Sequence, residues 1–126
     1  MSEVSLLRTL FDYQAWANEE LLGAIDRLDP DRLHAMLTAS DHWYLKYLET
    51  LAPERLSEAL PFIFTDGDKG CMTRQEMLLH VVTHGGYHRG EIGRLLAQLS
   101  ITPPWDTLAV HLHRSEPSRR LATAAE

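Results

Sequence analysis

Residues 73–99 read TRQEMLLHVVTHGGYHRGEIGRLLAQL, and this stretch decides the fold class. Its apolar residues recur at helical spacing, no proline interrupts it, and a proline pair follows shortly after it. Thr73 and Glu76 have the spacing of a capping box, in which each side chain accepts a hydrogen bond from the backbone of the other residue. The stretch therefore predicts one helix over residues 74–99, about 40 Å long.

The first amphipathic segment spans residues 4–28. Most of its apolar side chains, from Leu6 to Leu28, fall within one arc of a helical wheel drawn at about 100° per residue. Two polar residues, Gln14 and Asn18, intrude beside this arc, and Trp16 lies on the far side of the helix. The segment therefore predicts a helix that buries one face, with Trp16 free to form a second contact surface.

The middle of the chain predicts shorter elements. We expect a short helix that starts at Pro30, and a second helix that Thr38 or Ser40 caps. The second helix carries a core stripe at Tyr44, Tyr47, Leu48 and Leu51. A proline then starts a turn over residues 53–58, and residues 60–72 have the composition of an extended segment followed by a loop.

Length and composition indicate one domain, residues 1–126, and the predicted elements make it all-α, with a last short element over residues 105–112 and a loose tail over residues 113–126. Hydrophobic residues make up 44% and charged residues 24%, which is ordinary for a globular fold. The net charge of -6 argues against nucleic-acid binding. No apolar run reaches the roughly 20 residues of a membrane span, and the start lacks a secretory signal, so we expect a cytoplasmic protein without a membrane partner.

The long helix carries three histidines at intervals of four residues, His80, His84 and His88. Neighbours at this spacing lie about 6 Å apart along the helix axis, so two of them can share one ion, and neutral imidazole suits zinc and nickel. On the wheel, the apolar arc of this helix includes Leu95 and Leu99, which we expect in the core. His84 and His88 fall on the side of this arc, and His80 lies on its flank. We therefore expect His84 and His88 to point toward the core and to be metal ligands. The alternative is that they are ordinary helical histidines whose rings are hydrogen-bonded.

One helix cannot complete a metal site, so a third ligand has to come from elsewhere. Gly85 and Gly86 lie between the two histidines and favour a close approach. Either a helix or ligand comes close to the imidazoles, or a neighbouring helix simply packs tightly. The sequence leaves both explanations open.

Four segments of the sequence resemble the DinB family. The segment His80–Glu91 is similar to the family's H-x-x-x-H-R-G-[QE] pattern, and Tyr13–Asn18 is similar to its Y-x-x-W-A-N segment. Two further stretches, Phe62–Gly70 and Met72–Met77, also look like sequences of this family. The resemblance covers nearly the whole chain.

The resemblance implies an up-and-down four-helix bundle in which three histidines hold a divalent metal ion, nickel or zinc. Two of those metal ligands would be His84 and His88. It also implies a homodimer, and an activity as a metal-dependent hydrolase or a thiol-dependent transferase of unknown substrate. It assigns no residue as a general base.

The chain departs from the family pattern because the second helix, which brings the third histidine, has no counterpart here. Residues 31–35 lead directly into residues 36–44, which look like the family's third helix. We therefore expect a DinB-like bundle shortened by one helix. The candidates for the third ligand are His34, His42, a water molecule and a partner chain, although His42 points away from the core stripe of its helix.

A bundle that lacks one helix exposes apolar stripes, and the simplest cover is the same surface of a second copy. We therefore expect an obligate homodimer in which a histidine of the second copy is able to supply the third ligand. Two alternatives remain open. Residues 30–40 could fold back and close a monomeric bundle, or the protein could be a shortened, non-catalytic helical dimer that has lost its metal site.

Overall fold

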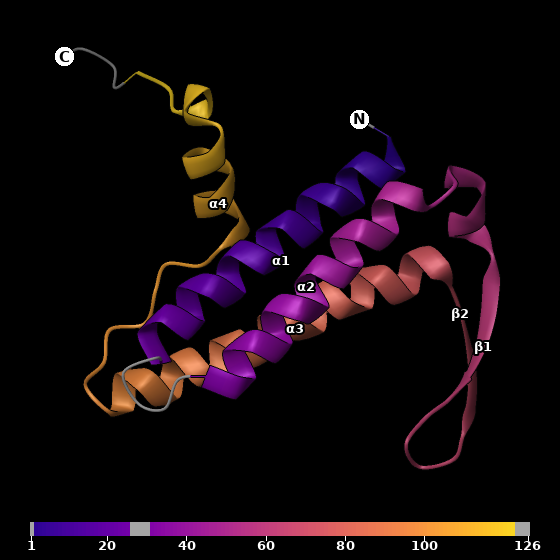
Figure 1. Ribbon diagram of the computed structural model, residues 1–126, viewed down its shortest axis with the longest axis horizontal. Coiled ribbons are helices and arrows are strands. Elements are labelled where there is room, and N and C mark those ends of the chain that lie inside the picture. The colour runs from indigo at the N-terminus through magenta and orange to yellow at the C-terminus, as the bar shows by residue number, and fades with distance from the viewer. Residues whose placement is uncertain (1, 26–30, 123–126) are drawn as a thin grey trace.

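Three long helices form most of the protein in the computed structural model, which describes residues 2–25 and 31–122. They are α1 (Glu3–Ile25), α2 (Asp31–Thr50) and α3 (Arg74–Gln98). Helix α1 packs against both α2 and α3, and Figure 1 shows the three running along one another. The short elements are η1 (Pro53–Ser57), β1 (Ala59–Ile63), β2 (Lys69–Thr73), α4 (Leu108–Ser115) and η2 (Pro117–Arg119). The expected, mainly helical architecture is confirmed.

One cluster of buried side chains joins the three long helices and η1. Phe11 of α1 is 2% exposed, and its ring stacks on Tyr44 of α2 with a centroid distance of 4.9 Å. The other buried members are Leu7, Leu48, Leu51, Leu56, Leu78 and Val82. Two leucines of the stripe expected for α2 are among them. On α1 the buried face is turned relative to the expected arc, because Leu7 is buried while Leu6 is 49% exposed.

The capping box at the start of α3 forms as the sequence predicts. The Thr73 hydroxyl accepts a hydrogen bond from the Glu76 backbone N–H at 3.1 Å, and Oε1 of Glu76 accepts one from the Thr73 N–H at 2.8 Å. The backbone N–H and the hydroxyl of Thr73 lower the pKa of the Glu76 carboxyl. Because Thr73 is also the last residue of β2, the cap fixes where the hairpin ends and the helix begins.

Strands β1 and β2 form an antiparallel hairpin in which Pro61 lies opposite Cys71. The turn forms where the sequence predicts a loop: Oδ1 of Asp66 accepts a hydrogen bond from the Asp68 N–H at 2.9 Å. Gly67 adopts a φ of 96° there, a conformation that favours glycine. The hairpin projects from the end of the bundle where α2 ends and α3 begins (Figure 1). It therefore forms the connection between these two helices.

The break that we expected within the second helical region is absent. Residues Asp31–Thr50 form one continuous helix, and neither Thr38 nor Ser40 caps a helix start. The Thr38 hydroxyl instead donates a hydrogen bond at 2.8 Å to Oε1 of Glu19 on α1. A side chain that resembles a cap in the sequence thus joins two helices. The helix start expected at Pro30 lies outside the described residues.

The C-terminal region is more regular than expected. Residues 113–115, which we expected in a loose tail, complete α4, and Pro117–Arg119 form a further 3₁₀ turn. Helix α4 lies against α1, on the side away from α2 in Figure 1. Among the described helices, none is long and apolar enough to cross a membrane.

Replacing Thr73 with alanine should lower the free energy of unfolding by about 1 kcal/mol, because the cap of α3 is lost. Thr83→Ala is the matched control, since Thr83 lies within the same helix and its hydroxyl donates to the carbonyl of Leu79. Alanine has the higher helix propensity at such a position, so the stability of the control should hold or rise slightly. Urea denaturation measures both changes, and equal losses in the two variants would contradict the capping role.

Candidate functional site

The three histidines of α3 lie on its exposed face. The expectation that His84 and His88 point toward the core is wrong, because both side chains are exposed, as is that of His80. The buried residues of α3 are Leu78, Val82, Arg89 and Leu96. Since this buried face turns toward α1, Leu95 and Leu99, which we expected in the core, are 57% and 64% exposed. The apolar residues of α3 thus divide between two faces of the helix.

His84 and His88 converge although they are exposed. Their Nε2 atoms lie 2.9 Å apart, and their rings meet edge to face with centroids 4.4 Å apart. The His80 ring stacks on the His84 ring at 5.2 Å, one turn toward the start of the helix. Oε1 of Glu91 lies 3.8 Å from Nδ1 of His88. The two imidazoles therefore form a pair whose Nε2 atoms face each other, and we call them the histidine pair.

Neither sequence candidate for a third ligand joins the histidine pair. Within residues 2–25 and 31–122, no group of three or more His, Cys, Asp or Glu side chains is arranged to hold a metal ion. Nε2 of His34 lies 3.0 Å from Oε2 of Glu19 on α1, and His42 is exposed on α2. Over its described residues, one chain therefore brings together two imidazoles without a third ligand beside them.

A buried polar network ties the three long helices together. Nδ2 of Asn18 donates to Oδ2 of Asp41 at 3.1 Å, and Oδ1 of Asn18 accepts from Nη1 of Arg89 at 3.1 Å. Nη2 of Arg89 lies 3.4 Å from the Tyr13 hydroxyl, and the guanidinium lies over the Tyr13 ring. Asp41 and Arg89 are only 6% and 5% exposed. In the sequence, Asn18 stands out as a polar residue beside the apolar arc, but its partners Asp41 and Arg89 were not predicted. The only signal for Arg89 is its place in the DinB-like segment.

Gly85 makes room for α1. A Cβ atom at Gly85 would lie 2.6 Å from Oε1 of Gln14, whereas one at Gly86 would lie 3.7 Å from Nη2 of Arg89. Gln14 is 6% exposed, and its Oε1 has no hydrogen-bond partner among the described residues. Of the two explanations for the glycines, the structure therefore supports tight packing against α1 at Gly85.

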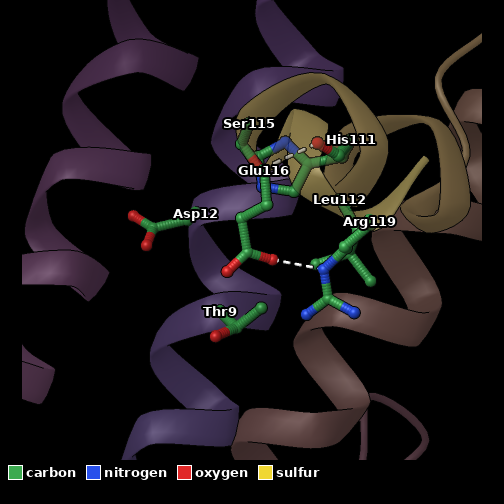
Figure 2. Close-up of a pocket in the computed structure, with 7 residues that line it drawn as sticks. All are labelled: Thr9, Asp12, His111, Leu112, Ser115, Glu116 and Arg119. Carbon is green, nitrogen blue, oxygen red and sulfur yellow. Dashed lines mark hydrogen bonds and ion pairs between the residues drawn. The ribbon is translucent and has the colours of Figure 1, made fainter. Parts of the chain in front are cut away.

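Helix α4 covers the surface of α1 that we expected to be free. Trp16 is half-buried, its ring lies 5.3 Å from the His111 ring, and the Arg114 guanidinium lies over it. Beside this contact is a hollow of about 440 Å³ between α1 and the chain around α4 (Figure 2). Figure 2 shows the ion pair between Glu116 and Arg119 in this hollow. The contact surface expected at Trp16 is therefore occupied within the chain.

Asp41→Asn tests the buried network through its pH dependence. Burial raises the pKa of the Asp41 carboxyl, although the Asn18 hydrogen bonds and the Arg89 charge act in the opposite direction. The folded state then takes up a proton more readily than the unfolded state. Wild-type protein should therefore gain stability relative to Asp41→Asn as the pH falls through the raised pKa toward about 4. Urea unfolding at a series of pH values measures this difference, and a wild type that instead loses stability relative to the variant on acidification would refute it.

Comparison with models of protein families matches residues 35–120 to the DinB family. The match takes in most of α2, the hairpin, α3 and α4, and with them the histidine pair and Arg89. No curated protein and no solved structure matches the chain. Because the family match spans more than half of the sequence, and the fold is the helical one that its motifs predict, the chain belongs to the DinB family.

Proposed function

We propose that the protein binds one divalent metal ion, nickel or zinc, through His84 and His88, and uses it as a hydrolase or a thiol-dependent transferase. The observation that carries this proposal is the 2.9 Å separation of the two Nε2 atoms. Metal–nitrogen bonds of about 2.0–2.1 Å place two nitrogens of one ion about 2.9 Å apart at the right angle of an octahedral or square-planar site, and about 3.3 Å apart at the tetrahedral angle that zinc prefers. The histidine pair is thus spaced as two adjacent ligands of one ion would be.

Two neighbouring side chains support the histidine pair. The Glu91 carboxylate lies 3.8 Å from Nδ1 of His88, beyond hydrogen-bond distance; a small shift of either side chain would let it accept a hydrogen bond from that ring and raise the ring's basicity as a ligand. The Tyr87 ring lies 6.2 Å from the His84 ring and 5.5 Å from the His88 ring, and limits the space on one side of them. A bound ion would supply activation of a water or thiol, or polarisation of a carbonyl.

A second copy of the chain is the proposed source of the third ligand. The face of α3 that bears the histidine pair also bears exposed apolar side chains, namely Tyr87 (65% exposed), Leu95 (57%) and Leu99 (64%). Contiguous apolar side chains rimmed by polar groups are typical of a protein interface. Burying this face in a homodimer would cover them and bring the two histidine pairs, or another histidine of the second copy, into reach of one ion.

Elemental analysis of protein purified without an affinity tag tests the metal site. His84→Ala or His88→Ala should abolish bound metal, whereas His80→Ala should retain most of it, because His80 and His88 are about 12 Å apart along the axis. Equal loss in all three variants would contradict the role of the pair. Because only neutral imidazole binds a metal ion, bound metal should also decrease when the pH drops below roughly 6.

Light scattering at micromolar concentration tests the dimer. Wild-type protein should have twice the chain mass of 14.4 kDa, and Leu95→Glu should shift it toward the monomer and lower its metal content, because the interface would bury a charge. Leu121→Glu is the matched control, since Leu121 is 92% exposed and lies outside α3. A stable, folded wild-type protein with a mass near 14.4 kDa would overturn the dimer and the shared ligand together.

Two observations favour a second candidate function. No third ligand lies beside the histidine pair in the described part of the chain, and a separation of 2.9 Å also fits a hydrogen bond between two neutral rings. The protein would then be a non-catalytic helical dimer that has lost its metal site. Dimeric protein that contains no metal, and takes up neither added nickel nor added zinc, would establish this function in place of the first.

A further inference from the structure

We infer that a groove beside α3 binds a small carboxylic acid with a short hydrocarbon body. The groove has a volume of about 310 Å³ and lies between the second half of α3, the end of α1 and residues 103–106. Its charged lining residues are Arg89, Arg94 and Asp106. None of the three histidines of α3 lines it, so its ligand and the proposed metal can be tested apart.

The buried end of the groove carries a positive charge that two carboxylates, those of Asp41 and Asp106, compensate without a hydrogen bond to it. Arg89 is 5% exposed, and its hydrogen bonds go to neutral groups, the Asn18 amide oxygen and the Tyr13 hydroxyl. Oδ2 of Asp106 lies 3.9 Å from Nε of Arg89, which is too far for a hydrogen bond. Because a charge-assisted hydrogen bond is stronger than an ion pair at 3.9 Å, an anion that reaches the Nε–H group would stabilise the guanidinium further.

The mouth of the groove carries a second arginine. Arg94 is exposed and forms no hydrogen bond or ion pair with the residues that the structure describes. Gly90 lines the groove together with the two arginines, and an added Cβ there would meet nothing within 4 Å. A planar guanidinium and a carboxylate pair through two parallel N–H···O bonds. The open floor at Gly90 therefore leaves room for a carboxylate between Arg89 and Arg94.

The walls of the groove are apolar. They are formed by Leu21 of α1 and by Pro103 and Pro104 of the segment that follows α3. Pockets for small molecules begin at about 300 Å³ and combine apolar walls with a few polar groups. A hydrocarbon body would cover these walls, whereas an inorganic anion would leave them exposed to water. This combination favours a carboxylic acid over inorganic phosphate.

The Asp106 carboxylate opposes the ligand. Its side chain is 25% exposed and faces the same guanidinium group that the ligand would bind. Two carboxylates beside one arginine repel each other. The ligand therefore competes with an internal carboxylate, and removing the charge of Asp106 should strengthen binding.

Titration of the full chain with hexanoate, followed through the NMR amide shifts of Gly90 and Gly93, tests the groove. Hexanoate should give saturable shifts, whereas hexanol and inorganic phosphate should not. Arg94→Gln should weaken hexanoate binding by about tenfold or more, because a hydrogen bond to a charged group is lost. Asp106→Asn should strengthen it by up to about fivefold, because a partly exposed like charge is removed.

Arg114→Gln is the matched control, because Arg114 lies over Trp16 at the contact between α1 and α4 and not in the groove. Its affinity for hexanoate should equal that of the wild type. The absence of a saturable shift with hexanoate, an equal response to hexanol, or an equal loss in Arg114→Gln overturns the proposal. Saturation by phosphate as tight as that by hexanoate overturns the assignment to a carboxylic acid.

Discussion

The side-chain amide of Asn18 is the contact on which the arrangement of the three long helices depends. Its Nδ2 binds the Asp41 carboxylate of α2 and its Oδ1 binds Arg89 of α3, so one residue of α1 sets the position of both neighbouring helices. Without the amide, Asp41 and Arg89 would lose hydrogen bonds while staying buried. A buried charged group that loses a hydrogen bond destabilises the fold more than an exposed one, because water cannot replace the lost partner. Packings in which α3 turns Arg89 away from α1 are therefore disfavoured.

This constraint also determines where the histidines lie. Successive residues of an α-helix are about 100° apart, so His84 and His88 lie about 140° and 100° from Arg89 around the axis of α3. When Arg89 faces α1, both imidazoles must turn away from α1. The exposure of the histidine pair is thus a consequence of burying Arg89. The same spacing of about 100° per residue also places His84 and His88 on one face, next to each other.

Elements with a local signal could be predicted from the sequence. The start of α3, the turn after α2 and the loop of the hairpin follow from capping, proline and glycine chemistry that acts within a few residues. Contacts between helices could not be predicted in this way, since Thr38 has the chemistry of a cap but binds Glu19, and Leu95 has core spacing but is exposed. The same distinction holds for the site. Helical spacing predicted that His84 and His88 lie together, but the direction in which they point depends on the residues of another helix that bind Arg89.

Helix α3 therefore has three surfaces whose directions are fixed together. Arg89 faces α1, the histidine pair lies on one flank of it, and Gly90 lies about 100° away on the other flank, beside the groove. A metal ion on the pair and an acid in the groove would not compete for space. Both would nevertheless depend on Arg89, because this side chain reaches Asn18 and also lines the groove. A ligand in the groove would thus hold the residue that sets the rotation of α3, and with it the direction in which the histidine pair points.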